Sequence, residues 1–162
     1  MHSGCGEAGP ADGSRRFRIG IVCTVRLYRD AFRSVLERTN HLQVVDSGHT
    51  ADDLIRSRCE VDAVLFDIGG GVDLAEIRRL APAIAPRPVV GFGVDCVEAA
   101  VDCVEAGLAG FLPAEGSVAD LVATLEGALN GRLFCSPETA RRMAERLAAR
   151  ALERPRRSPG PY

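Results

Sequence analysis

The stretch VDAVLFDIGGG, residues 61–71, decides how the chain folds. Its residues from Val61 to Phe66 are apolar except for one, a pattern typical of a strand that is buried on both faces of a parallel sheet. The run ends in Asp67, and three glycines follow after one further residue. Asp67 is therefore expected at the carboxyl end of a buried strand. A carboxylate there can accept a phosphoryl group, bind a metal ion or cap a turn.

Strand-like and helix-like patterns alternate on both sides of this stretch. Four further β-rich runs are predicted as strands, at residues 17–23, 42–45, 88–92 and 108–112. Each strand is followed by apolar residues at spacings of three and four, which indicate an amphipathic helix. Thr50 with Asp53, and Ser117 with Asp120, have the spacing of a capping box, and Asp95 is predicted to cap the fourth helix.

Five strand–helix alternations favour one architecture. Parallel strands joined by helices need right-handed crossovers, and the helices must cover both faces of the sheet. We therefore predict an α/β fold, a (βα)5 doubly wound parallel sheet, in which sites gather at the carboxyl ends of the strands.

A sixth helix is predicted after this domain. Ser136 is a suitable cap and Pro137 a suitable first helical residue, and an apolar side follows, formed by Ala140, Met143, Ala144, Leu147 and Ala151. The predicted organisation is a disordered segment at 1–16, a single domain at 17–130, an amphipathic helix at 131–153 and a disordered tail at 154–162.

Composition excludes several classes of protein. A chain of 162 residues that is 46% hydrophobic can bury one core, and it contains neither an apolar run of membrane-spanning length nor a secretory signal. We expect a cytoplasmic protein with reduced cysteines and no membrane partner. The net charge of −2 provides no global field for nucleic acid, and all 20 basic residues are arginine.

Four motifs carry a resemblance to a known family. They are RLYRDAF at 26–32, DAVLFD at 62–67, AGLAGFL at 106–112 and GRLFCSPETA at 131–140. Residues 17–130 resemble a response-regulator receiver domain, and residues 131–150 are similar to the connector helix of LuxR-type response regulators. The resemblance implies a flavodoxin-like receiver fold, a part in two-component signalling or phosphorelay, and a phosphoacceptor role for Asp67.

The residues that should assist phosphoryl transfer differ from the family pattern. The family places two acidic Mg²⁺ ligands where this chain has Cys23 and Thr24, and a lysine where it has Ala114. The family's hydroxyl residue falls at Phe92 or Gly93. Because phosphoryl transfer needs a metal ion and a cation to meet the developing charge, we predict that the Mg²⁺ site is lost, that no cofactor is bound, and that Asp67 is not phosphorylated.

The sequence leaves three possible roles for Asp67. It is predicted as a vestigial acceptor whose oxygens bind the loop amides of residues 69–71. It can also be a turn carboxylate with a structural role only, or the acceptor of a surviving phosphorylation switch. A phosphatase of the haloacid-dehalogenase type is excluded because it needs a second aspartate at position 69, which is glycine, and we predict no catalytic residues and no enzyme.

The expected function is the regulation of signal transduction or transcription through protein contacts. We predict a stand-alone, phosphorylation-independent receiver-like regulator that contacts itself or a full-length regulator and does not bind DNA directly. The expected contact residues are Cys103, Val104, Leu125, Met143 and Leu147. One alternative is a receiver that senses an apolar metabolite in a degenerate acidic pocket, for which the predicted residues are Cys23, Thr24, Phe92, Gly93 and Ala114. The other is the receiver part of a LuxR-type DNA-binding regulator.

Overall fold

The computed structural model describes residues 15–70 and 73–153. The predicted disordered segments 1–16 and 154–162 lie outside this part of the chain, apart from Arg15 and Arg16. The elements, in chain order, are β1 (Phe17–Val22), α1 (Arg26–Glu37), β2 (Leu42–Gly48), α2 (Ala51–Ser57), β3 (Ala63–Asp67), α3 (Leu74–Ile84), β4 (Val89–Val94), α4 (Val97–Ala106), β5 (Gly110–Pro113), α5 (Val118–Leu129) and α6 (Pro137–Glu153).

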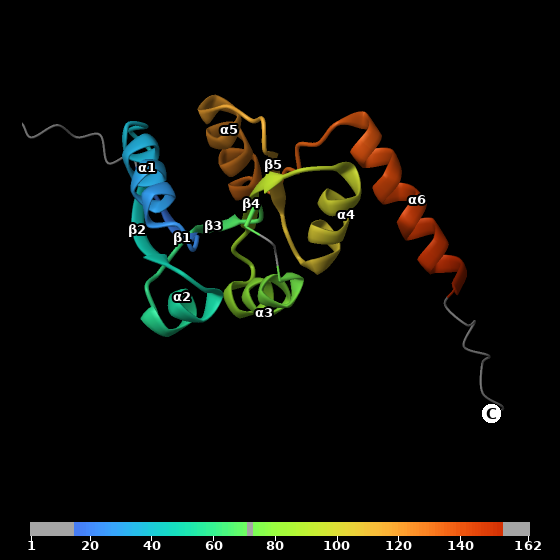
Figure 1. The fold of residues 1–162 in the computed structure, drawn as a ribbon, viewed down its shortest axis with the longest axis horizontal. Helices are drawn as coiled ribbons and strands as arrows, with labels where there is room; N and C mark the ends of the chain where they lie inside the picture. Colours follow the sequence, from blue (N-terminus) through green and yellow to red (C-terminus); the bar gives the residue numbers. More distant parts are fainter. Residues whose placement is uncertain (1–14, 71–72, 154–162) are drawn as a thin grey trace, which may run out of the picture.

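The five strands form one parallel sheet in the order β2-β1-β3-β4-β5. Helices α1 and α5 pack on one face of this sheet, and α2, α3 and α4 pack on the other (Figure 1). The predicted (βα)5 doubly wound sheet with an additional C-terminal helix is confirmed.

The central strand β3 shows how one sequence builds both cores. Its side chains alternate across the sheet, so that Val64 and Phe66 join the core under α2, α3 and α4, while Ala63 and Leu65 join the core under α1 and α5. All four are 5% exposed or less. The same alternation directs Asp67 toward the face that α1 and α5 cover.

Side-chain caps set the starts of several helices. Thr50 with Asp53 and Ser117 with Asp120 form the two predicted capping boxes, and Asp73 caps α3. The predicted cap of α4 is wrong: its N-cap is Cys96, whose sulfur accepts the amide hydrogen of Ala99. β2 is also longer than predicted, because its pairing with β1 continues to Gly48.

Helix α6 follows the domain and lies along α4 (Figure 1). The Oγ of Ser136 accepts the amide hydrogen of Thr139, as expected for a cap. The predicted apolar side of α6 is only partly buried, since Met143 packs against the core whereas Leu147 is 64% exposed. No helix in the described part of the chain combines the length and apolar character needed to cross a membrane.

Candidate functional site

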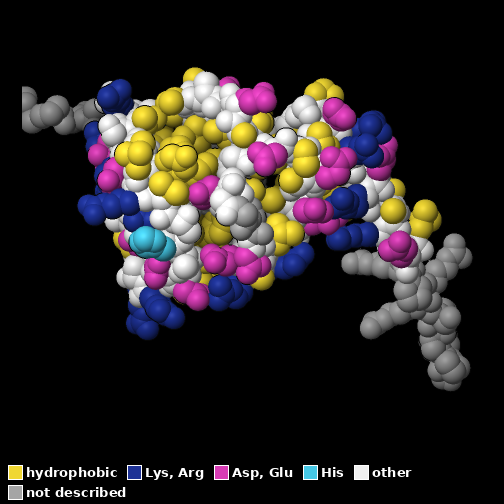
Figure 2. Space-filling view, viewed as in Figure 1, with side chains coloured by type: hydrophobic (Ala, Val, Ile, Leu, Met, Phe, Trp, Pro, Cys, Tyr) yellow, Lys and Arg dark blue, Asp and Glu magenta, His cyan; other side chains and the backbone are white. Residues whose placement is uncertain are grey.

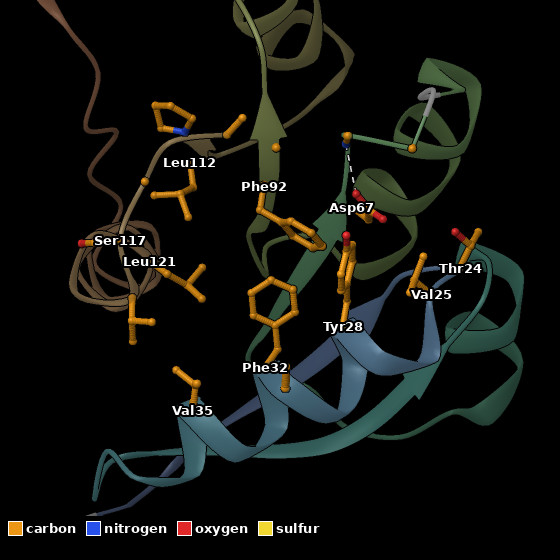
Figure 3. Close-up of a pocket in the computed structure, with 18 residues that line it drawn as sticks. Thr24, Val25, Tyr28, Phe32, Val35, Asp67, Phe92, Leu112, Ser117 and Leu121 are labelled. Carbon is orange, nitrogen blue, oxygen red and sulfur yellow. Dashed lines mark hydrogen bonds between the residues drawn. The ribbon is translucent and has the colours of Figure 1, made fainter.

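The sheet order creates a crevice at the carboxyl ends of β1 and β3. From β1 the chain crosses to β2 on one side, and it later returns to β3 on the other, so the connections that leave these two neighbouring strands diverge. Cys23 and Thr24 follow β1 directly, and Asp67 ends β3. A cavity of about 640 Å³ opens at this edge, lined by Thr24 and Asp67, and extends between α1 and α5 (Figure 3).

Within residues 15–70 and 73–153, two neutral groups donate to Asp67. The backbone amide of Gly69 donates to Oδ1 at 3.0 Å, and the thiol of Cys23 donates to Oδ2 at 3.2 Å. The first contact confirms part of the predicted binding of loop amides by Asp67, while Gly71 lies outside the described residues. Asp67 therefore stabilises the turn after β3 through hydrogen bonds that involve no cation.

The Cys23 thiol lies where the family resemblance predicts an acidic Mg²⁺ ligand. It is 1% exposed, and its burial, together with the hydrogen bond to Asp67, raises the pKa of the thiol to about 11. At neutral pH it remains a protonated donor. Mg²⁺ is a hard cation that prefers oxygen ligands, and a protonated thiol and a hydroxyl beside one carboxylate do not suit it. Across residues 15–70 and 73–153, no three His, Cys, Asp or Glu side chains come together as a metal site.

The end of β4 is shaped by a ring and a glycine. Phe92 is 8% exposed, and its ring packs against Phe32 of α1 with 4.6 Å between ring centroids. Gly93 has φ of +83°, and a Cβ there would lie 2.9 Å from the amide nitrogen of Gly69. Neither position can place a hydroxyl near Asp67: the phenyl ring lacks one, and the close approach and the positive φ favour glycine.

Ala114 follows β5 and also lines the cavity. Its side chain is a methyl group, at the position where the family resemblance predicts an ammonium. The cavity thus contains all of the predicted pocket residues except Cys23, which lines a smaller adjoining cavity with Thr24 and Asp67. These residues lie close together because each follows or ends a neighbouring strand.

Most of the cavity wall is apolar and was not predicted. Helix α1 contributes Tyr28, Phe32 and Val35, and α5 contributes Val118 and Leu121 (Figure 3). Hydrophobic side chains gather over the space between these helices in Figure 2. Tyr28 and Phe32 are four residues apart, which places both on one side of a helix. This spacing was the sequence signal that could have indicated the aromatic wall. The periodicity predicted an amphipathic helix here but did not show that one side of it faces a cavity.

The predicted contact residues divide into two groups. Leu125 and Cys103 are 0% and 2% exposed, so their selection as contact residues is corrected: they belong to the cores beneath α5 and α4. Val104 and Met143 are half-buried and pack against the core, and Leu147 is exposed. The correction has a simple cause, since residues at helical spacing on an apolar face bury themselves against the sheet first.

Comparisons with known proteins agree with this architecture. No protein-family model matches the sequence, and no curated protein matches it. Among solved structures, a two-component response regulator of the LuxR family from Aurantimonas sp. SI85-9A1 is 25% identical, with a TM-score of 0.69, over 82% of this chain and 99% of that chain.

Two further structures extend the comparison. The response regulator ChrA of a heme-sensing two-component system is 26% identical, with a TM-score of 0.59, over 88% of this chain and 69% of that chain. A structure of two RcsB dimers bound to two parallel DNAs is 15% identical, with a TM-score of 0.62, over 80% of this chain and 69% of that chain. The chain therefore contains a receiver-like domain that resembles the N-terminal half of LuxR-type response regulators.

Proposed function

We propose that this protein is an atypical receiver-like regulator that works without phosphorylation and acts through contacts with other protein chains rather than as an enzyme. Residues 17–130 form the regulatory module, and residues 131–153 form a connector-like segment whose helix is α6, Pro137–Glu153. The observation that carries the proposal is the environment of Asp67, whose oxygens bind a thiol and a backbone amide.

The chemistry of phosphoryl transfer supports this conclusion. A phosphoryl group on Asp67 would bring added negative charge to a carboxylate that has only uncharged donors. Ala114 supplies no cation there, and Cys23 is a protonated thiol at neutral pH. The same carboxylate that accepts phosphate in the family is here part of a turn.

Protein contact is supported by the surface of α6. Leu147 and Leu152 are 64% and 87% exposed, so this helix presents apolar side chains to solvent. The resemblance to response regulators, which include the dimeric RcsB structure, is in keeping with self-association or binding to another regulator.

Intact-mass spectrometry after incubation with acetyl phosphate and Mg²⁺ tests the proposal. We expect no mass gain of one phosphoryl group, and we expect millimolar Mg²⁺ to leave the melting temperature unchanged, because an ion that does not bind the native state cannot stabilise it. A stoichiometric gain that Asp67→Asn abolishes would overturn the proposal.

A gain-of-function variant provides the matched control. The triple change Cys23→Asp, Thr24→Asp and Ala114→Lys restores the family's acidic pair and its lysine around the same Asp67. We expect this variant to bind Mg²⁺ and to acquire the phosphoryl group that the natural chain does not. That result would show that the missing partners, rather than an inaccessible Asp67, account for the inert natural protein.

A further inference from the structure

The cavity between α1 and α5 has the size of a small-molecule site. Its volume of about 640 Å³ lies within the usual range for ligand pockets. One end, at the strand ends, carries Asp67 and Thr24, whereas the other end lies between Val35 of α1 and Leu121 of α5 (Figure 3). The cavity is therefore polar and acidic at one end and apolar along its body.

The acidic end carries the charge of Asp67, and the nearby guanidinium of Arg29 donates to the backbone carbonyl of Cys23 rather than to Asp67. A carboxylate offers about four acceptor positions, and among the described residues Gly69 and Cys23 occupy two of those of Asp67. Within residues 15–70 and 73–153, no ion pair involves Asp67. A cationic group entering the cavity would gain a charge-assisted hydrogen bond there, whereas a phosphate or carboxylate would be repelled.

Aromatic rings continue from this acidic end. The ring of Tyr28 stands beside Asp67, and the rings of Phe32 and Phe92 follow, tilted by 58° to one another (Figure 3). Aromatic faces attract organic cations and pack well against flat apolar groups. An anion followed by aromatic and aliphatic walls matches a ligand with an ammonium group attached to a flat apolar body.

We propose that this cavity binds a small organic amine, with its ammonium group on the Asp67 carboxylate and its flat apolar body between α1 and α5. A metal ion is disfavoured because the donors do not form a ligand set. This inference goes beyond the proposed function, because either can hold without the other: the mass test concerns phosphoryl uptake, and the cavity concerns ligand binding.

Three probes with a common ring test the charge preference. They are 1-naphthylmethylamine, 1-naphthalenemethanol and 1-naphthoic acid. The chain contains no tryptophan, so naphthalene fluorescence anisotropy can be followed on the whole protein with little interference. We expect the amine to bind at least about tenfold more tightly than the alcohol, and the acid to bind most weakly.

Three variants test whether the preference for the amine arises from this cavity. Asp67→Asn keeps the shape of the side chain, and we expect it to reduce amine affinity about tenfold, to the level of the alcohol. Asp95→Asn is the matched control, because Asp95 is an exposed carboxylate at the same sheet edge that does not line this cavity, and it should leave affinity unchanged. Ala31→Phe, which fills the cavity from α1, should weaken both amine and alcohol.

Several results would overturn the proposal. They are the absence of amine binding at about 1 mM, equal affinities for amine and alcohol, or full amine affinity in a folded Asp67→Asn variant. A second copy of the chain is the competing occupant of the groove. A wild-type dimer that Ala31→Phe converts to a folded monomer in sedimentation would show that the groove is a subunit contact, and that result would also reject the ligand site.

Discussion

Two aspartates with opposite surroundings lie at the two ends of strand β3. Asp62, immediately before the strand, accepts hydrogen bonds from the backbone amide, Nε and Nη2 of Arg18, at 2.7, 3.2 and 3.2 Å, and a further one from Arg15. Asp67, at the last residue of the strand, is bonded to a thiol and an amide. One carboxylate is paired with arginine, and the other faces a cavity without an ion pair in the described part of the chain.

The contrast indicates a structural role for Asp62 and leaves Asp67 available for a functional one. The hydrogen bonds from Arg18 hold the pKa of Asp62 below its usual range, and the side chain of Asp62 is only 15% exposed. Asp62 thereby ties the start of β3 to the start of β1. Among the described residues Asp67 makes fewer contacts, none of them with a charged donor, so we expect the fold to depend on it less.

The largest expected effect is the loss of stability on neutralising Asp62. Asp62→Asn removes the charge that Arg18 binds, and hydrogen bonds to charged groups contribute about 1.5–3 kcal/mol each. We expect the free energy of unfolding to fall by about 2 kcal/mol in urea titrations. Asp67→Asn is the paired comparison, with an expected change of no more than about 1 kcal/mol. Equal losses would remove the distinction between the two ends of the strand.

Acid titration sharpens the same comparison. Because the folded-state pKa of Asp62 lies below its unfolded value, its contribution to stability is present above the unfolded pKa of about 3.9 and is lost as pH falls through the folded pKa. Asp62→Asn should therefore flatten the decline in stability below about pH 4. A variant that keeps the full acid dependence of the wild type would contradict this assignment.

The next effect concerns the two apolar residues of α6. Met143 packs against the core, so Met143→Glu places a charge on an apolar contact and should cost roughly 1–3 kcal/mol or release α6 from the domain. Leu147 is exposed, and Leu147→Glu should change stability by less than about 0.5 kcal/mol. Urea titration measures the stability of both variants, and hydrogen exchange of the α6 amides measures whether α6 is released from the domain.

Sedimentation of the same pair tests self-association. If α6 forms a subunit contact, Leu147→Glu should convert a dimer to a folded monomer without loss of stability. A wild-type protein that remains monomeric at high micromolar concentration would reject self-association through α6. A large stability loss in Leu147→Glu would instead contradict its exposed position.

Much of the fold could be predicted because it depends on local patterns. The apolar run of β3 and the capping boxes at Thr50 and Ser117 mark strand and helix positions without reference to distant residues. The start of α4 was missed by one residue because Asp95 is the commoner cap, whereas the structure uses the sulfur of Cys96. The first residue of a helix therefore depends on which of two neighbouring side chains caps it.

The site was predicted only at the strand ends. Cys23, Asp67 and Ala114 each follow or end a strand, so alternation alone places them at one edge. The aromatic wall depends on how far α1 stands from α5, which periodicity does not reveal: Phe32 meets Phe92 across the gap, and Tyr28 faces the cavity. Burial of Leu125 and Cys103 was missed because helical spacing marks an apolar face without showing whether that face packs against the sheet or against a partner.

The smallest expected effect concerns the charged contact between α4 and α6, where acidic and basic side chains lie together in Figure 2. Arg146 pairs with Asp102 and with Glu105, and Arg150 pairs with Glu105 at 2.8 Å. The hydrogen bond to Asp102 raises the pKa of Arg146, which stays charged at all relevant pH values.

Arg146→Met keeps the apolar stem and removes the charge, so we expect a lower melting temperature at low salt, by less than the change in Met143→Glu. At about 1 M salt the Debye length is only about 3 Å, and the difference from wild type should nearly vanish, because exposed ion pairs are weak and screened. Differential scanning calorimetry across a salt series measures this difference in melting temperature. Asp67→Asn should show no matching salt dependence, since no ion pair is broken in the described part of the chain. A salt-independent loss in Arg146→Met would show that packing of the arginine stem, rather than its charge, holds α6 against α4.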